Sequence, residues 1–352
     1  MINKSFLSFE IELFKVSYDK GPLISPYSIG VCLTKIFNLI NSDEDKLLLL
    51  KVLKCNTNDF SNYSNKMTKI VKDIEQNLSI KTANLLFKET EFEPNKCEQY
   101  NNQNFPEIIQ LNSLINSTPS SINKIVKSKT NGRIKELMNP MMRMNDNHVA
   151  MSSVTTFECR FKNPFTNHSK HRFHGFHESK ATFMMVKKRE NIIYSRRKGM
   201  TMVQLPFEDD KTSLCLIMPN KKGEKYFHRM IEKMNLKTFQ SLFSHRITKK
   251  LDLMIPELDI ETDSFNCFDH LAKLGIESES FHLENEDKLI HFRQKCSFSL
   301  NKKGTVPKDN NFVPEEKKNI HYPKVAFNRP FLYFVMNHRP EVVLLCGSIL
   351  MC

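Results

Sequence analysis

Apolar residues recur every three or four positions along the first quarter of the chain. This spacing places them on one face of a helix, and it predicts a first helix over about residues 2–17. Its buried stripe consists of Ile2, Phe6, Phe9, Leu13 and Val16. Three more helices are predicted, beginning after Ser25-Pro26, after the cap residue Ser42 and at about Asp59. The first part of the chain is therefore expected to be helical.

The pattern changes after about residue 80, where short apolar and β-branched runs bounded by turn residues become frequent. These runs predict strands at 80–87, 107–111, 149–157, 200–205, 213–218, 251–255, 331–336 and 342–350. Helices are predicted at 121–129, 226–234 and 268–274. Helices that precede strands, without regular alternation of the two, favour an α+β fold with a largely antiparallel sheet.

One long polar stretch interrupts the strand-rich part. Residues 304–325 contain three prolines and directly precede the C-terminal strands. A loop of this length inside a compact protein is usually functional or disordered.

Several segments, in the same order along the chain, resemble the serpin family. They are 25–29, 82–87, 122–134, 204–219, 255–276, 301–305 and the C-terminal 327–335 and 342–347. The resemblance runs over nearly the whole chain and is strongest to intracellular and poxvirus-type serpins. It implies a single serpin domain over residues 1–352, with N-terminal helices on a large, mostly antiparallel main sheet plus smaller sheets. It also implies an exposed reactive loop at about 304–325.

The resemblance further implies a function as bait for a serine or cysteine protease. In serpins the protease attacks one bond of the exposed loop, and the loop then inserts into the main sheet as an extra strand. Counting from Gly304 places the attacked bond near Lys317, Lys318 or Asn319, although the same residues also fit an ordinary solvated charge run. The serpin supplies no catalytic group, so we expect neither an enzyme nor a cofactor, and we expect a monomer.

The hinge of the expected loop departs from the family pattern. Gly304 and Thr305 match it, and Val306, Pro307, Lys308 and Asp309 follow. Insertion buries every second residue, and the family places small residues there. Pro307 lacks an amide hydrogen for a central strand, and a buried unpaired Asp309 is unfavourable. We therefore expect weak or absent inhibition. The alternative is a non-inhibitory serpin that acts as a binding or immune-modulating protein through its basic surface.

A second set of residues matches the family's sheet-opening cluster. The resemblance assigns to it Ser25, Ser28, Ser153 and Gln294. Serpins usually have asparagine where Ser153 stands and commonly histidine where Gln294 stands, and Phe161 replaces a usual tryptophan. These substitutions fit either a repacked core or a loss of function.

The net charge of the chain predicts a further class of partner. The formal net charge is +13, which favours acidic partners such as a glycosaminoglycan or another polyanion. Basic runs at 187–189 and 196–198 flank an apolar segment and would form one patch if they folded as a hairpin. The alternative is that basic residues are simply dispersed over a solvated surface.

The remaining features exclude other classes of protein. His168, His171, His174 and His177 recur every third residue, a spacing that fits neither one strand face nor a helical pair, so we expect no metal site. The nine cysteines form no CxxC pair and are expected to be reduced. No apolar run is long enough to span a membrane, and residues 1–14 do not fit a cleaved signal peptide. We therefore expect a cytoplasmic protein, with unconventional secretion left open.

Overall fold

The computed structural model describes residues 2–19, 23–76, 79–88, 107–110, 119–137, 148–277, 281–283, 288–305 and 323–351. They form two compact units. The first comprises Met1–Ser17, Ile24–Thr156 and Glu261–Ser297. The second comprises Tyr18–Leu23, Phe157–Ile260 and Phe298–Cys352. The single domain expected over residues 1–352 stays a prediction, and each unit is described by itself.

The first unit is built around a six-stranded sheet. Its strand order is β10-β11-β3-β1-β2, and β9 pairs with the outer side of β11. The strands are β1 (Ile80–Lys88), β2 (Glu107–Gln110), β3 (His148–Phe157), β9 (Leu258–Glu261), β10 (Phe265–Asn266) and β11 (Lys288–Leu300). Two of the pairs, β1–β2 and β3–β11, are parallel.

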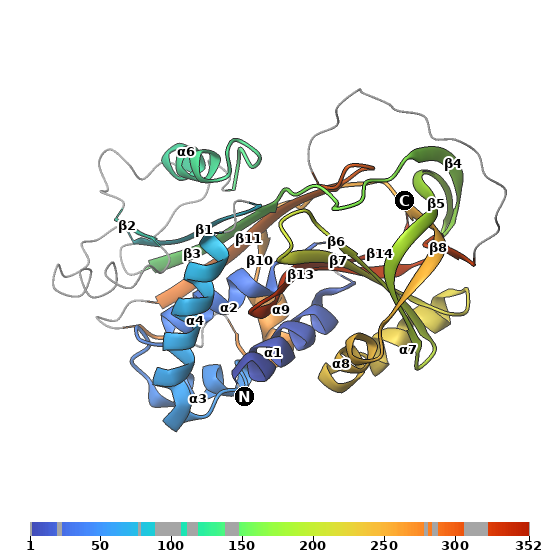
Figure 1. Ribbon diagram of the computed structural model, residues 1–352. Coiled ribbons are helices and arrows are strands. Elements are labelled where there is room, and N and C mark those ends of the chain that lie inside the picture. The colour runs from blue at the N-terminus through green and yellow to red at the C-terminus, as the bar shows by residue number, and fades with distance from the viewer. Residues whose placement is uncertain are drawn as a thin grey trace. The chain divides into compact units, whose positions relative to one another are not determined.

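Helices cover both faces of this sheet. Figure 1 shows α6 (Pro119–Lys129) over one face of β1 and β3, and α2 (Pro26–Ile36) over the opposite face. The other helical elements of the unit are α1 (Ile2–Ser17), α3 (Asp43–Val52), η1 (Thr57–Asp59), α4 (Phe60–Glu75), α9 (Phe268–Leu271) and η2 (Ala272–Leu274). All eleven residues of α2 are buried, which makes it the central helix of the unit.

The alternation of side chains along β3 explains how this strand contacts α6 on one face and α2 on the other. Ala150 and Val154 pack in one apolar cluster with Ile122 and Val126 of α6. Neighbouring side chains on a strand point to opposite faces. Ser153 and Thr155 therefore point to the other face, where they contact α2.

The second unit is built around an eight-stranded sheet of order β12-β8-β5-β6-β7-β13-β14, with β4 paired to β5. The strands are β4 (Asn167–His174), β5 (Glu178–Arg197), β6 (Met200–Pro206), β7 (Thr212–Pro219), β8 (Ile247–Pro256), β12 (Lys324–Ala326), β13 (Phe331–His338) and β14 (Glu341–Ile349). Its helices are α7 (Glu224–Lys233) and α8 (Leu236–Ser244). Apart from the parallel pair β8–β12, the paired strands of this sheet are antiparallel. The predicted α+β class is confirmed.

Two expectations about this unit were wrong. The basic runs at 187–189 and 196–198 do not form a hairpin, because residues 187–189, Arg196 and Arg197 all lie on the single strand β5 and Lys198 begins the turn that follows it. The hairpin turn comes after Arg197, between β5 and β6. The long polar loop also ends earlier than residue 325, since Lys324 and Val325 already pair with β8 in strand β12.

Candidate functional site

The two neighbouring parallel strands β3 and β11 form the centre of the six-stranded sheet. They pair directly with each other from Lys288 opposite His148 to Ser297 opposite Thr156, with one register shift after Leu289. We call this line of pairing the β3–β11 seam. A further strand can enter the sheet here only if the ladder hydrogen bonds of the seam first break.

Gln294 lies in the middle of the seam and joins three elements. Its side chain is completely buried, and Ser153 of β3 is its register partner. Its Oε1 accepts a hydrogen bond from the Ser25 N–H at 2.9 Å. Its Nε2 lies 3.1 Å from the Ser25 carbonyl oxygen, 3.2 Å from Ser28 Oγ and 3.3 Å from Ser153 Oγ. Gln294 therefore connects β11 both to β3 and to the start of α2.

The serines complete a buried polar cluster. Ser28 Oγ lies 2.6 Å from Ser153 Oγ and 3.0 Å from Thr155 Oγ1. Ser25 caps α2, with its side chain accepting from the Ser28 N–H. The four residues assigned from the sequence thus lie together, although that assignment had omitted Thr155. Its position two residues after Ser153, on the same strand face, is the signal that would have found it.

The chemistry of the polar cluster is neutral. Serine, threonine and glutamine side chains do not titrate in the ordinary pH range. Cys296, the register partner of Thr155, is fully buried, and burial raises the pKa of its thiol. The described cysteines are all free thiols: Cys32, Cys55, Cys159, Cys215, Cys267, Cys296 and Cys346. The seam is therefore held by hydrogen bonds between uncharged groups.

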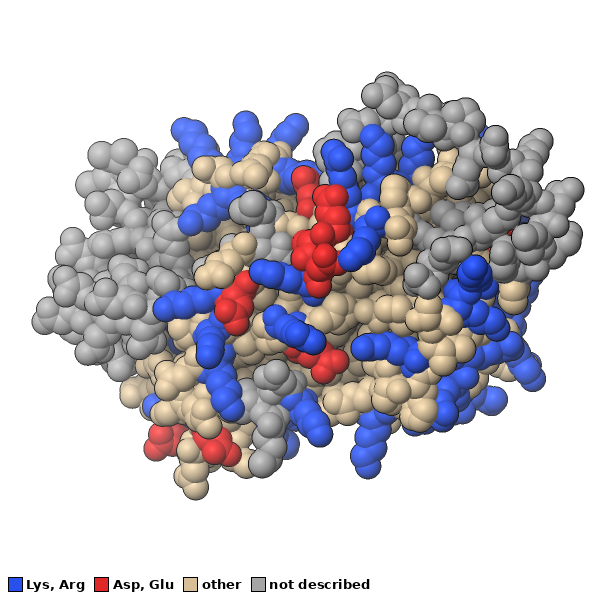
Figure 2. Space-filling model, in the orientation of Figure 1, with Lys and Arg blue, Asp and Glu red and all other residues tan. Residues whose placement is uncertain are grey.

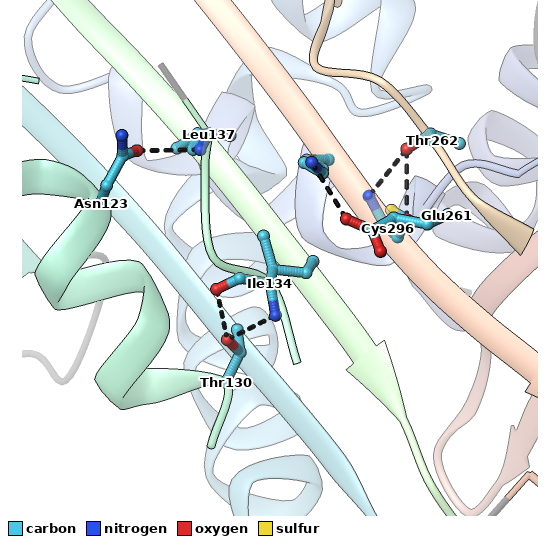
Figure 3. A network of polar contacts seen from close by, with 8 residues as sticks. Asn123, Thr130, Ile134, Leu137, Glu261, Thr262 and Cys296 are labelled. Carbon is cyan, nitrogen blue, oxygen red and sulfur yellow. Dashed lines mark hydrogen bonds and ion pairs between the residues drawn. The ribbon is translucent and has the colours of Figure 1, made fainter. Parts of the chain in front are cut away.

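The side of β11 that faces away from β3 is also held, by hydrogen bonds and an ion pair. Thr262 Oγ1 accepts from the Cys296 N–H at 3.0 Å (Figure 3). The Thr262 N–H also donates to the Cys296 carbonyl at 3.0 Å. Next to it, Lys295 Nζ lies 3.1 Å from Glu261 Oε1. Opening the seam therefore has to move this neighbouring segment together with β11.

The segment after α6 is held against that helix. Thr130 Oγ1 donates to the Val126 carbonyl at 2.8 Å and accepts from the Ile134 N–H at 3.2 Å. Asn123 Oδ1 accepts from the Leu137 N–H at 2.9 Å (Figure 3). Ile134 and Leu137 belong to the apolar cluster between α6 and the sheet. Helix α6 is therefore firmly seated over β1 and β3.

In the second unit, residues 301–305 form a tight turn that we call the hinge turn. Asn301 and Gly304 exchange two backbone hydrogen bonds of 2.8 and 3.0 Å. Thr305 is completely buried. Its N–H donates to the Cys159 carbonyl at 2.8 Å, and its Oγ1 accepts from the Cys159 N–H at 2.6 Å. The start of the expected loop is therefore pinned to the chain that follows β3.

Glycine is required at position 304. The backbone there has φ +137°, and a Cβ would lie 2.3 Å from the Cys159 carbonyl oxygen and 2.8 Å from Arg160 Cα. Phe161 and Phe165 donate their N–H groups to the Lys303 and Lys302 carbonyls, both at 2.7 Å, which keeps the two segments close. Sequence reasoning had not included Cys159, because it precedes Thr305 by 146 positions.

The Gly304→Ala variant is expected to lose about 3 kcal/mol of the free energy of unfolding, because it adds a backbone clash to the strain of a positive φ. Gly132→Ala is the matched control. Gly132 also has a positive φ, +78°, but a Cβ there would meet nothing within 4 Å, so about 1 kcal/mol is expected. Urea unfolding measures both. Equal losses for the two variants would contradict the role assigned to the close approach at Cys159.

Other residues assigned from the sequence lie outside the described residues. They are the hinge residues Val306, Pro307, Lys308 and Asp309 and the reactive-bond candidates Lys317, Lys318 and Asn319. The histidine run is described and belongs largely to β4, where His168 and His174 share one face and His171 lies on the other. Among the described residues, no group of three or more His, Cys, Asp or Glu side chains could hold a metal ion.

The family model described as Serpin (serine protease inhibitor) matches residues 6–352. The chain therefore belongs to the serpin family. Members of this family are protease inhibitors rather than catalysts.

Individual relatives are distant but span the chain. Serine proteinase inhibitor 1 of monkeypox virus is 22% identical over 344 residues, which cover 93% of this chain and 95% of the relative. Human serpin B8 is 21% identical and covers 97% and 96%. Among solved structures, the thermophilic serpin tengpin in its native state has a TM-score of 0.82 at 20% identity, covering 100% of this chain and 94% of its own. Native protease nexin-1 with heparin has a TM-score of 0.81 at 17% identity, covering 100% and 99%.

None of the helices that the structure describes combines the length and the apolar character needed to cross a bilayer.

Proposed function

We propose that this serpin presents the segment after Thr305 to a protease and is cleaved there, but inserts the cleaved segment into its main sheet poorly or not at all. In the inhibitory mechanism of the family, the protease forms an acyl bond with the loop. Insertion must then outrun hydrolysis of that bond. A chain with slow insertion behaves as a substrate, and the protease is released active.

The main observation in support of this proposal is that Thr305 is buried. Side chains of an extended strand alternate between faces, so residues 307 and 309 share the side of Thr305 if the chain continues as a strand. Thr305 has no exposed surface and hydrogen-bonds to Cys159 on that side. With this alternation, the side chains of Pro307 and Asp309 point into the core of the sheet during insertion.

Each of these two residues opposes insertion. Proline in the interior of a sheet cannot donate its ladder hydrogen bond, and a carboxylate buried without a partner has to lose its hydration or bind a proton. We assign an obstacle of about 3 kcal/mol or more to each. Lys302 and Lys303 stand where the family usually has acidic residues, and Lys308 where it has alanine.

The polar cluster at the seam supports the same conclusion. Insertion between β3 and β11 has to separate Gln294 from Ser153, which lie opposite each other and are 3.3 Å apart between Nε2 and Oγ. A loop with two unfavourable inward residues supplies less free energy to break these contacts.

The experiment is incubation with trypsin-like proteases, because a lysine at 317 or 318 suits a specificity pocket with an acidic base. We expect cleavage between residues 305 and 323 without an SDS-stable complex. A covalent complex with any of the proteases would overturn the proposal.

A second candidate function is polyanion binding through positive charge on β5 and the turn that follows it. Figure 2 shows Lys and Arg side chains over much of the visible face, with Asp and Glu gathered in a few small groups. Arg196, Arg197 and Lys198 are all exposed at the turn between β5 and β6. Protease nexin-1, a structural neighbour, was solved with heparin.

This candidate predicts retention on a heparin column with elution by salt. Polyanion affinity falls as salt rises, because bound counterions are released on binding. The Arg196→Glu/Arg197→Glu variant is expected to elute at markedly lower salt. The control is Lys221→Glu/Lys222→Glu, which changes the net charge equally at two other exposed positions. The same loss in both variants would show that only total charge matters.

A further inference from the structure

Strand β4 is an edge of the eight-stranded sheet and carries the unusual histidine-rich and basic run. Among the described strands it pairs with β5 alone, from Asn167 opposite Met185 to His174 opposite Glu178, without a register shift. The His174 N–H donates to the Asn328 carbonyl at 2.8 Å rather than to β5. Backbone groups of alternate residues on a strand point to the same side. The backbone groups of Lys170 and Arg172 therefore face away from β5.

The two faces of the β4–β5 ribbon are very different. On one face Phe173 and Phe183 are completely buried, and His171 contacts Phe183 edge-on at 5.9 Å between ring centroids. On the other face Lys170 and Arg172 are exposed, together with Lys180 of β5. We call these three residues the β4 cationic triad.

The cationic triad is arranged unfavourably for stability. Arg172 lies directly opposite Lys180 in the register, and Lys170 is the next residue of β4 on the same face. Like charges directly opposite each other destabilise a strand pair. Among the side chains that the structure describes, which do not include that of Glu178, none forms an ion pair with any of the three.

A single lysine would be enough to protect an edge strand from unwanted pairing. A triad that includes a repulsive cross-strand pair needs another explanation, and an anionic ligand provides it. The open backbone of β4 distinguishes among anionic ligands, because only a polypeptide can add a strand to it. An added strand would place alternate side chains on the face of the triad, about 7 Å apart, which matches the spacing of Lys170 and Arg172.

We propose that β4 binds an extended acidic segment of a partner protein, which pairs with the open edge and directs acidic side chains at alternate positions toward Lys170, Arg172 and Lys180. This site is separate from the segment that a protease would cleave. Its test does not involve protease inhibition, so the two proposals succeed or fail independently.

The test uses a fluorescein-labelled peptide of sequence TETETET and fluorescence anisotropy with the whole protein. We expect the peptide to bind, and the neutral TQTQTQT peptide to bind at least tenfold more weakly. An acidic peptide N-methylated at alternate residues keeps its charge but cannot form the ladder. We expect it to bind at least fivefold more weakly than TETETET. Equal binding by the methylated peptide would overturn the proposal and leave a plain polyanion surface.

Arg172→Glu is the decisive variant. It is expected to weaken binding of TETETET at least tenfold, while the melting temperature stays equal or rises, because the repulsion with Lys180 is replaced by attraction. Lys222→Glu is the matched control, with the same change of charge at an exposed position outside the triad, and is expected to change binding less than twofold. The proposal is wrong if both variants weaken binding equally, or if neither does.

Discussion

Cleavage between residues 305 and 323 is expected to leave the melting temperature of this serpin almost unchanged, within about 5 °C of the intact protein. A serpin that inserts its cleaved loop gains a strand, its ladder hydrogen bonds and buried side chains, and becomes much more stable. Pro307 and Asp309 oppose that gain if their side chains lie on the same side of the inserted strand as the buried Thr305.

The Pro307→Ala/Asp309→Ala variant is expected to recover insertion. Removing two obstacles of about 3 kcal/mol each gives about 6 kcal/mol. At about 2 °C per kcal/mol for a protein of this size, the melting temperature after cleavage should rise by about 12 °C. The same variant should form some SDS-stable complex with a trypsin-like protease, because faster insertion traps more of the acyl-enzyme.

Lys308→Ala is the control for this experiment. It changes the same segment, but position 308 points outward when 307 and 309 point inward. We expect little change in the melting temperature of the cleaved protein. If the unmodified protein already becomes strongly heat-resistant on cleavage, or if Lys308→Ala gives as large a gain as the double variant, the assignment of the hinge is wrong.

The second large effect is expected at the seam. Gln294→Ala should lower the free energy of unfolding by about 4 kcal/mol, because it removes a fully buried side chain and leaves the N–H and carbonyl of Ser25 without their partner. Ser28 and Ser153 lose a shared donor as well. Urea unfolding followed by circular dichroism measures the loss.

Two further variants make this result interpretable. Gln76→Ala removes the same atoms from an exposed position at the end of α4 and is expected to change stability by less than about 0.5 kcal/mol. Gln294→Met keeps the volume but not the hydrogen bonds. If Gln294→Met is as stable as the unmodified protein, the contribution of Gln294 is packing rather than hydrogen bonding.

The local spacing of apolar residues was enough to predict many elements, including α1, α4 and the C-terminal hairpin of β13 and β14. These segments bury one face or are buried throughout, so their apolar residues recur in a regular pattern. The family resemblance rested on the same kind of contiguous segment, and the family model confirmed it over residues 6–352.

Strand β11 was missed although it is central to the fold. Its inward residues Phe292, Cys296, Phe298 and Leu300 do alternate, but the buried Gln294 interrupts the apolar pattern. A buried glutamine looks like a surface residue in a sequence, because nothing local indicates which groups will satisfy its hydrogen bonds.

The sequence by itself determined the serpin family, the α+β class and the residues of the polar cluster other than Thr155. Only the tertiary structure decided that Gln294 bonds to Ser25, 269 positions away, and that Thr305 is buried against Cys159. It alone also placed the basic run on β4, which among the described strands pairs only with β5. The reason is physical: periodicity reports which face of one element is apolar, whereas partners and edges depend on which distant strand lies beside it.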